Sequence, residues 1–279
     1  MGPKGLKPCC SANMIIASIV IVTKNQKSFL EKTLPILLDQ KIKEQFEIIV
    51  VDSGSTDGAK EYVKKTGNIR LIEIQSENFN YAHAFNTGAA HAKGKYLIRL
   101  SGDCIPQGKD WLSQIVRPFK DPKVGGSFGK YILSGKKGFG HPDYWPSWRF
   151  PKKLTTYSIK PFWFMGAGLL NFSLGKNVYE FAGGCCAVRK EIWQKRPFNE
   201  SLLAGEDAEY SWFLHIIGYN IVYNPYVKVV HEHKINVKKS AKTHLGITKW
   251  NWIFNITIWK YWINRLGGKD PYRDFVYKD

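Results

Sequence analysis

Residues 47–58, Glu-Ile-Ile-Val-Val-Asp-Ser-Gly-Ser-Thr-Asp-Gly, decide the fold. The first half of this stretch is apolar and β-branched, which is typical of a strand buried on both faces of a parallel sheet. The second half begins at Asp52 and consists of turn-forming residues, including Gly54 and Gly58. A carboxylate therefore follows a buried strand directly, at the place where open α/β sheets bind their ligands.

Predicted strands and helices alternate on both sides of this stretch. The hydrophobic pattern predicts strands over residues 15–22, 47–51, 69–74 and 96–100, and helices over residues 28–40, 57–66 and 81–92. Ser28 is the expected N-cap of the first helix. This alternation predicts the α/β class, with a mostly parallel central sheet flanked by helices. Asp52 and Asp103 both follow predicted strands, so we expect them at the same edge of the sheet.

The second half of the chain is less regular. Residues 125–179 are rich in Gly, Pro, Lys and aromatic side chains, and are predicted to form loops and short elements around an acceptor site. A strand over 181–188, a helix over 190–195, a helix after Gly205 and a strand over 220–230 are predicted next. We therefore expect a basic tail at 1–14, one domain at 15–235 with halves at 15–124 and 125–235, and a C-terminal helical extension at 236–279.

The composition limits the classes of partner. The chain has 279 residues, a net charge of +18 and five Cys without the CxxC spacing of zinc sites. The charge favours an anionic partner, which is nucleic acid, an acidic membrane or a phosphate-bearing substrate. The apolar run at 15–22 is too short to span a bilayer, and no signal core precedes it. We expect a cytoplasmic protein with reduced Cys, at most peripheral at the inner face of a membrane.

Acidic residues at the predicted element ends are candidates for chemistry, each with a structural alternative. Asp52 can bind a base or ribose or can cap its turn, although Asp57 is the better capping candidate. Asp103 can ligate Mg²⁺ or Mn²⁺ through oxygen or can be a turn residue. Glu206 and Asp207 open a helix, where the helix dipole favours acids, but two acids in a cleft also make a general-base site.

Two histidines follow the last predicted strand. His231 and His233 are two residues apart, so they would face the same side of an extended strand. Either of them can complete an oxygen-rich metal site as a neutral imidazole.

The order of these motifs resembles glycosyltransferase family 2, which has the Rossmann-like GT-A fold. The resemblance covers roughly residues 15–235 and is carried by residues 19–23, 50–58, 84–103, 183–189 and 205–233. The segment 79–89, Phe-Asn-Tyr-Ala-His-Ala-Phe-Asn-Thr-Gly-Ala, and the segment 101–104, Ser-Gly-Asp-Cys, resemble the rhamnosyltransferase-like branch. The resemblance implies inverting, metal-assisted transfer of a sugar from a nucleotide-sugar to a hydroxyl of a glycan or lipid-linked acceptor.

The resemblance also implies roles for individual residues. Asp207 would be the catalytic base, with Glu206 beside it. Asp103 and His231 would ligate Mn²⁺ or Mg²⁺, with His233 as the alternative to His231. The residues implied for the nucleotide and donor sugar are Thr23, Asn25, Asp52, Ser53, Asn80, His83, Asn86, Gly183 and Gly184.

The chain departs from the family pattern at two positions. Ser101 stands where the first acid of the Asp-x-Asp metal motif is expected, although that position is often non-acidic in the rhamnosyltransferase-like branch. One carboxylate and one His then remain for the metal, so the donor diphosphate would complete its shell. The usual Phe-Asp-Glu is Phe198-Asn199-Glu200, a change expected to affect structure rather than chemistry.

Other functions explain the sequence less well. A nucleotidyltransferase needs a Gly-rich phosphate loop after its first strand, but residues 22–26 are Val-Thr-Lys-Asn-Gln. A nucleic-acid-binding protein would explain the charge but not the ordered acids, so no nucleic-acid partner is expected. A family member without activity is disfavoured because Asp103, Glu206 and Asp207 are all present.

The C-terminal extension leaves two alternatives open. It carries Trp250, Trp252, Trp259 and Trp262 among many Lys and Arg, and is too polar to span a bilayer. Its Trp face would either lie on an anionic membrane, which would present the site to a lipid-linked acceptor, or pack on the core of the protein. The sequence does not predict the sugar, the nucleotide, the acceptor or the oligomeric state.

Overall fold

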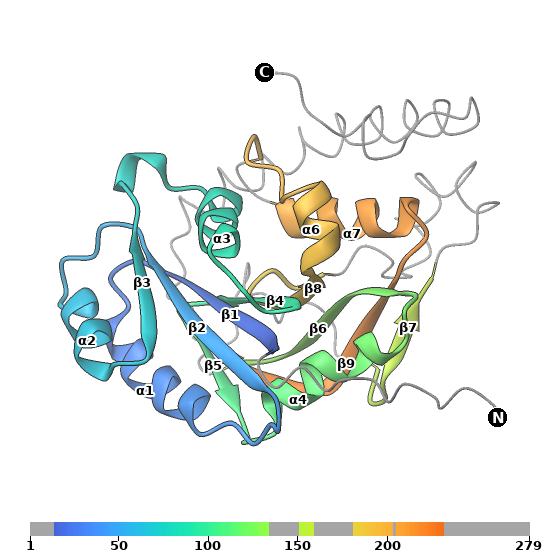
Figure 1. The fold of residues 1–279 in the computed structure, drawn as a ribbon, viewed down its shortest axis with the longest axis horizontal. Helices are drawn as coiled ribbons and strands as arrows, with labels where there is room; N and C mark the ends of the chain where they lie inside the picture. The colour runs from blue at the N-terminus through green and yellow to red at the C-terminus, as the bar shows by residue number, and fades with distance from the viewer. Residues whose placement is uncertain (1–13, 134–150, 159–180, 203–204, 232–279) are drawn as a thin grey trace, which may run out of the picture.

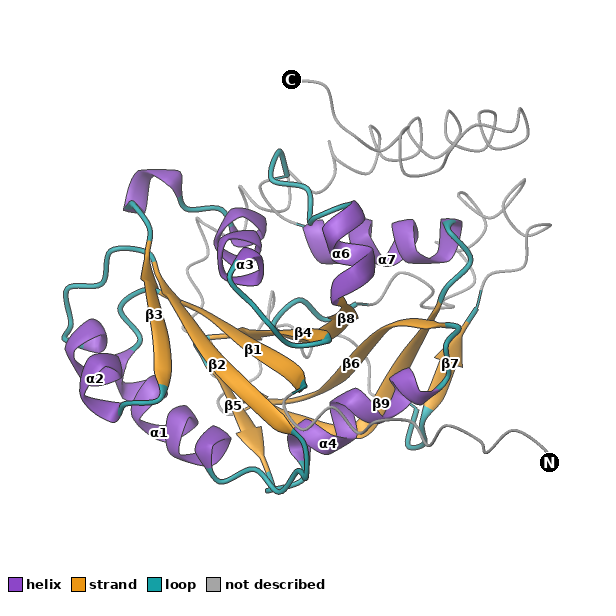
Figure 2. Cartoon of the chain, in the orientation of Figure 1, coloured by secondary structure: helices purple, strands orange, loops and turns teal. Residues whose placement is uncertain are grey.

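The structure is a computed structural model that describes residues 14–133, 151–158, 181–202 and 205–231 (Figure 1). These residues form a nine-stranded mixed sheet with helices on both faces, as Figure 2 shows. The predicted α/β class with a central sheet is therefore confirmed. The predicted tail and C-terminal extension lie outside the described residues, so the domain boundaries remain predictions.

The first half of the chain forms the parallel part of the sheet. Along the chain the elements are β1 (Ile15–Thr23), α1 (Lys27–Leu38), β2 (Gln45–Asp52), α2 (Ala59–Thr66), β3 (Ile69–Glu73), a 3₁₀ turn (Ser76–Asn78), α3 (Tyr81–Ala90) and β4 (Tyr96–Ser101). The strands lie in the order β3-β2-β1-β4 and pair in parallel. Their carboxyl ends share one edge, and the strand order reverses beside β1, where open α/β sheets bind ligands.

The second half of the chain forms the mixed part of the sheet. Its elements are β5 (Cys104–Gln107), α4 (Trp111–Val116), a 3₁₀ turn (Arg117–Lys120), β6 (Val124–Leu133), β7 (Thr155–Tyr157), β8 (Cys185–Arg189), α6 (Lys190–Lys195), α7 (Glu206–Ile216) and β9 (Asn220–His231). Strand β8 is antiparallel to both β4 and β6, and β9 is parallel to β6 but antiparallel to β5 and β7. The parallel pairing expected from the sequence thus holds from β1 to β4 and between β6 and β9, whereas the other pairs are antiparallel.

Strand β6 corrects the prediction of loops and short elements over residues 125–179. The prediction failed because Gly is depleted in strands, so a segment rich in Gly does not resemble a strand. Here the glycines allow close packing. A Cβ on Gly125 would lie 2.7 Å from Tyr219 Cβ, and one on Gly129 would lie 2.5 Å from the carbonyl oxygen of Val227.

Several element boundaries also differ from the sequence prediction. Helix α1 begins at Lys27 with Gln26 as its N-cap, so the assignment of Ser28 as N-cap was wrong. Strand β8 begins at Cys185 rather than at residue 181. The short elements β5 and α4 were not predicted, because each is too short to show a clear period.

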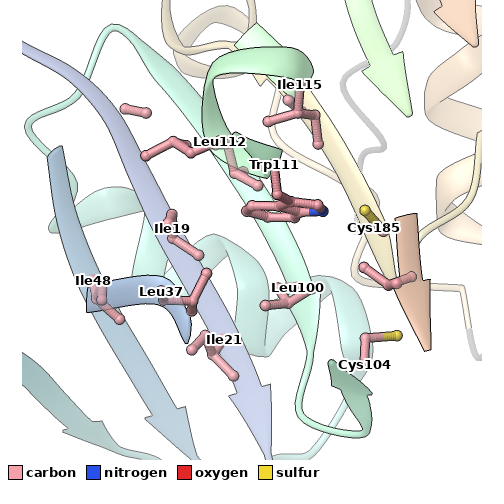
Figure 3. Close-up of a cluster of buried hydrophobic side chains, with 14 of the residues drawn as sticks. Ile19, Ile21, Leu37, Ile48, Leu100, Cys104, Trp111, Leu112, Ile115 and Cys185 are labelled. Atoms are coloured by element: carbon pink, nitrogen blue, oxygen red, sulfur yellow. The ribbon is translucent and has the colours of Figure 1, made fainter. Parts of the chain in front are cut away.

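Alternating residues of the buried strands pack into two apolar layers, one on each face of the sheet. Ile19 and Ile21 of β1 pack with α1, α2 and α4 on one face, and Figure 3 shows them with Leu37 and Trp111. Val20 and Val22 pack with α3, α6 and α7 on the other face. Helices on both faces explain why these strands are continuously apolar. No helix among the described residues is long and apolar enough to cross a membrane.

Gly94, between α3 and β4, provides a test of this packing. A Cβ at Gly94 would lie 2.4 Å from the backbone of Ala17 and Ser18, which cannot move without distorting β1. We expect Gly94→Ala to lower the free energy of unfolding by about 1–3 kcal/mol, measured by urea denaturation. The exposed neighbour Lys93→Ala should change it by less than about 0.5 kcal/mol. Equal stability of the two variants would contradict the close approach of residue 94 to β1.

Candidate active site

A carboxylate and an imidazole meet at the carboxyl end of β4. Residue Cys104 of β5 pairs with His231 of β9, which brings the end of β9 next to Asp103. The Oδ2 atom of Asp103 lies 3.4 Å from Nε2 of His231, and both residues are buried. The hydroxyl of Ser101 donates to Oδ1 of Asp103 at 2.5 Å. Ser101, at the position expected to be an acid, thus orients the remaining carboxylate.

Cys104 adds a third ligand atom that the sequence analysis did not single out. Its Sγ, an oxygen of Asp103 and a nitrogen of His231 lie within 4.8 Å of one another. A set of O, N and S atoms at this spacing fits a divalent cation. Burial raises the pKa of the Cys104 thiol well above its usual value, so the thiol is protonated unless a cation replaces the proton.

Two adjacent glycines, Gly183 and Gly184, connect the Asp103–His231 pair to Asp207. Gly184 accepts a hydrogen bond from the Ser101 N–H at 3.0 Å, and its own N–H donates to the Tyr131 hydroxyl at 2.8 Å. A Cβ on Gly184 would lie 2.7 Å from that hydroxyl oxygen, and one on Gly183 would lie 2.6 Å from Oδ2 of Asp207. Only glycine fits at either position without displacing a site residue.

Asp207 lies in the first turn of α7, partly buried. Its Oδ2 accepts a hydrogen bond from the Gly183 N–H at 2.8 Å, and its Oδ1 accepts one from the Ala208 N–H at 2.8 Å. Burial and then the charge of Glu206 raise the pKa of Asp207 to about 6, against the opposing effect of Arg99 and the two N–H groups. A carboxyl that titrates near neutral pH can take up and release a proton in a reaction at that pH.

Glu206 is held differently from Asp207. Its Oε1 lies 2.5 Å from Nη2 of Arg99, and both side chains are buried. Arg99 lies in the interior of β4, where the sequence analysis assigned it no role. Because Glu206 faces Arg99 and not the edge of the sheet, the two acids at the start of α7 differ in their surroundings. Asp207 is the better placed of the two to act as a base.

The polar residues of α3 hold the loop that leads to α7. Asn80 caps α3 through Oδ1, and its Nδ2 donates to the carbonyls of Glu200 and Leu202, each at 2.8 Å. His83 Nδ1 lies 2.9 Å from Oε2 of Glu200. Asn86 donates to Glu200 Oε1 and to the Phe198 carbonyl, both at 2.8 Å. Their role in donor binding stays a prediction, and in this structure they position residues 198–202.

Asn86 also accepts hydrogen bonds on its side-chain oxygen. The donors are Nε1 of Trp193 at 2.9 Å and the Phe198 N–H at 3.1 Å. With Nδ2 also occupied, the Asn86 amide is fully engaged in joining α3 to α6 and to the loop before α7.

The loops after β1 and β2 are joined by the other residues expected to bind the nucleotide. The Asp52 carboxylate accepts hydrogen bonds from the N–H groups of Gly54 at 3.0 Å and Ser55 at 2.8 Å. Asn25 has a left-handed φ of 53° and accepts from the Thr56 N–H at 2.8 Å. Oδ2 of Asp52 is buried without a hydrogen-bond partner among the described residues. Contact of Asp52 with a base remains a prediction.

Thr23 and Ser53 lie on the neighbouring strand ends. The Thr23 hydroxyl donates to Oε1 of Gln26 at 3.1 Å, and the Ser53 N–H donates to the Thr23 carbonyl at 3.0 Å. A Cβ on Gly102 would lie 2.8 Å from the Thr23 hydroxyl oxygen, so Thr23 packs directly on the turn that carries Asp103. The predicted nucleotide loop is therefore in contact with the predicted metal turn.

Tyr81 is a further residue that the sequence analysis missed. It is the first residue of α3, its side chain is 40% exposed, and its ring lies 6.0 Å from the Arg99 guanidinium carbon. Partial burial, then Asp103 and Glu206, raise the pKa of its phenol. An exposed aromatic ring near both acids can contact a bound sugar. An aromatic residue in the first turn of a predicted helix gives no such signal in the sequence.

Comparison with known proteins identifies the family. Residues 18–196 match the family described as Glycosyl transferase family 2. The chain belongs to glycosyltransferase family 2. This family member is 24% identical over 219 residues to Glycosyltransferase AglE of Haloferax volcanii, over 76% of the chain and 66% of AglE. It spans between 24% and 66% of the length of the first curated relatives it matches.

Solved structures of glycosyltransferases show the same fold. Staphylococcus aureus TarS in complex with UDP-GlcNAc has a TM-score of 0.65 at 14% identity, over 90% of this chain and 72% of TarS. The mannosyltransferase PcManGT from Pyrobaculum calidifontis, in complex with GDP-Man and Mn²⁺, has a TM-score of 0.57 at 17% identity, over 94% of this chain and 78% of PcManGT. At these identities the likeness establishes the GT-A fold of this glycosyltransferase family 2 chain. Its place in the rhamnosyltransferase-like branch stays a prediction.

The residues implied by the family resemblance fall into three groups in this glycosyltransferase family 2 chain. The group that meets at the carboxyl end of β4 comprises Asp103, Gly183, Gly184, Asp207 and His231. The second group, which holds the loop before α7, consists of Asn80, His83 and Asn86. The third group, which joins the loops after β1 and β2, consists of Thr23, Asn25, Asp52 and Ser53. His233 lies outside the described residues, so the choice between the two histidines stays open.

The raised pKa of Asp207 predicts how stability depends on pH. The folded protein binds this proton more tightly than the unfolded chain, whose Asp has a pKa of 3.8. The stability that Asp207 contributes is therefore fully present below about pH 4 and lost as pH rises through about 6. We expect Asp207→Asn to become steadily more stable relative to wild type over that interval, measured by urea unfolding.

Asp39→Asn is the matched control, because the pKa of the Asp39 carboxyl is shifted in the opposite direction from that of Asp207. Asp39 is exposed, and its hydrogen bond to Lys109 lowers its pKa. Asp39→Asn should therefore gain nothing relative to wild type as pH rises. A difference in free energy of unfolding between Asp207→Asn and wild type that stays constant from about pH 4 to 6 would show that the fold does not disfavour the Asp207 carboxylate.

Proposed function

We propose that this chain transfers a sugar from a nucleotide-sugar donor to an acceptor hydroxyl, with inversion at the anomeric carbon. The observation that carries the proposal is Asp207, a carboxyl whose pKa is raised to about 6 by burial and by the charge of Glu206. It is joined through the Gly183–Gly184 backbone to the turn of Asp103 and His231. Membership in glycosyltransferase family 2 supports the reaction class.

Asp207 would act as the general base. The acceptor O–H proton passes to an Asp207 carboxylate oxygen as the acceptor oxygen attacks the anomeric carbon. The bond from that carbon to the donor diphosphate breaks, and the nucleoside diphosphate leaves with the electron pair. A single displacement of this kind inverts the configuration of the carbon. Glu206, bound to Arg99, takes no part in the proton transfer.

Asp103 and His231 would hold a divalent cation. Such a cation, Mn²⁺ or Mg²⁺, neutralises charge on a leaving diphosphate. Ser101 orients the Asp103 carboxylate by its hydrogen bond, and Cys104 supplies a further ligand atom nearby. PcManGT, whose structure contains Mn²⁺ and GDP-Man, has the same fold, which supports this proposal.

The donor would lie across the ends of β1, β2 and β4. The joined loops that carry Thr23, Asn25 and Ser53 would bind the nucleotide. The absence of side chains at Gly183 and Gly184 would let the donor sugar approach the backbone closely. TarS and PcManGT bind UDP-GlcNAc and GDP-Man respectively, so both nucleotides belong in a donor screen. The proposed acceptor is a glycan or a lipid-linked glycan, and a membrane contact of residues 236–279 stays a prediction.

The first test of function is Asp207→Asn. The amide keeps the shape of the side chain but cannot accept the proton, so we expect turnover to fall by about 10²–10⁴. Donor affinity, measured by calorimetry, should change little. Purified protein is first screened for transfer with a panel of nucleotide-sugars and acceptors in the presence of Mn²⁺. Asp39→Asn, far from this edge of the sheet, is the control. Wild-type turnover by Asp207→Asn would exclude Asp207 as the base.

The second test concerns the metal. We expect transfer to require a divalent cation, because the Asp103–His231 pair would otherwise face a diphosphate without a counter-charge. Asp103→Ala and His231→Ala should each raise the Mn²⁺ concentration needed for half-maximal rate by about tenfold or more. His91→Ala, an exposed residue at the end of α3, is the matched control. Full activity of wild type in excess EDTA would rule out the metal site.

A further inference from the structure

Arg99 occupies a position where a charged side chain is costly. It lies in the interior of β4, paired with Val20 of β1 on one side and with Cys186 of β8 on the other. The residue is 6% exposed. Burial of a guanidinium among apolar side chains is unfavourable unless it is paired. The groups that contact the Arg99 guanidinium must therefore offset the cost of its burial.

Aromatic rings lie near the Arg99 guanidinium, and Glu206 binds one of its nitrogens. Its central carbon lies 6.0 Å from the ring centroid of Phe85 and 5.7 Å from that of Phe198. Nη2 binds Glu206, whereas Nη1 has no hydrogen-bond partner among the described residues. Burial opposes the charge on Arg99, but Glu206 and other acidic groups outweigh it and raise its pKa, so it stays charged.

A buried ion pair of this kind is a weak argument for stability, because well-packed apolar residues often stabilise a core as much. Its position suggests a different role. The pair joins the middle of β4 directly to the first turn of α7, one residue before Asp207.

Within the described part of the chain, the ionisable groups that face Asp207 come from four elements. Glu206 precedes it on α7, Arg99 lies on β4, Cys186 on β8 and Tyr131 on β6. Arg99 is the cation among them, and it opposes the effect of Glu206 on Asp207. Two adjacent buried carboxyls without a counter-charge tend to share a proton.

We propose that Arg99 is a positioning residue of the transfer reaction, which anchors the first turn of α7 to β4 through Glu206 and opposes the effect of the Glu206 charge on Asp207. Asp207 is then ionised when the acceptor arrives. The inference rests on the proposed function, since it assigns Asp207 as the base. It adds a residue that lies under the site and does not touch the substrate.

Two substitutions should move the pH dependence of turnover in opposite directions. Arg99→Met removes the cation, so Asp207 keeps its proton up to higher pH. The midpoint of the acid limb of the kcat–pH profile should therefore move up by about one pH unit. Glu206→Gln keeps an acceptor for Arg99 but removes the charge that raises the pKa of Asp207, so the limb should fall. Arg99→Lys should return the limb toward its wild-type position.

Arg196→Met is the matched control. Arg196 forms another buried ion pair with α7, at Glu209 less than one turn further on, and its guanidinium carbon lies 4.5 Å from the Phe213 centroid. Loss of that pair should lower stability, as loss of the Arg99 pair does, but should leave the acid limb in place. A purely structural role of Arg99 predicts that the limb stays in place in Arg99→Met, as it does in Arg196→Met.

A second measurement does not depend on activity. Proteins with ¹³C-labelled Asp and Glu carboxyls are titrated by NMR, and the Asp207 signal is assigned by its loss in Asp207→Asn. The inference requires the Asp207 midpoint to rise in Arg99→Met, fall in Glu206→Gln and stay in place in Arg196→Met. Should Arg99→Met not fold, Arg99→Gln replaces it, because glutamine also removes the cation but keeps a hydrogen-bond donor for Glu206.

The outcomes separate the inference from the proposed function. An Asp207 midpoint that does not respond to Glu206→Gln or to substitution of Arg99 overturns the inference, whatever the activity. If the midpoints move as expected but the wild-type protein transfers no sugar from any donor tested, the proposed function is contradicted. The coupling of Arg99 to Asp207 would then stand without the reaction.

Discussion

The pairing of β4 with β1 on one side and β8 on the other is the constraint on which the site depends. Because β4 runs parallel to β1, its carboxyl end lies beside the loops after β1 and β2. Because β8 runs antiparallel to β4, the chain before β8 is brought to the same edge. Gly183 and Gly184 then lie against Ser101 and Asp207. The predicted metal, donor and base positions thus meet at one place through backbone hydrogen bonds.

The two acids at the start of α7 show how local surroundings separate neighbouring residues of like chemistry. Glu206 faces inward to Arg99, whereas Asp207 faces the backbone of Gly183. Burial next to a charged neighbour disfavours the ionised form of Asp207, and the N–H groups of Gly183 and Ala208 favour it. The balance leaves a carboxyl whose proton affinity suits exchange near neutral pH. Helix capping, the structural alternative for these acids, does not account for that difference.

Much of the fold could be predicted from local patterns. The strands β1, β2, β3 and β4 and the helix α6 were found within a few residues, because apolar runs and turn residues mark them directly. Strand β6 was missed because Gly125, Gly126 and Gly129 look like a loop, although each allows a close contact that forms only in the folded sheet. The antiparallel pairings in the second half were not predicted either, since strand direction depends on partners that are distant along the chain.

The sequence by itself determined the family, the class of fold and the acids that could serve a reaction, because these depend on residue types in order along the chain. Only the tertiary structure showed how the surroundings of Asp207 and Glu206 differ, placed His231 beside Asp103, and showed that Asn80, His83 and Asn86 hold the loop before α7. It also revealed Arg99, Cys104 and Tyr81 near the site. The physical reason is that burial, hydrogen bonding and charge proximity are properties of contacts between distant segments, and a linear pattern does not contain them.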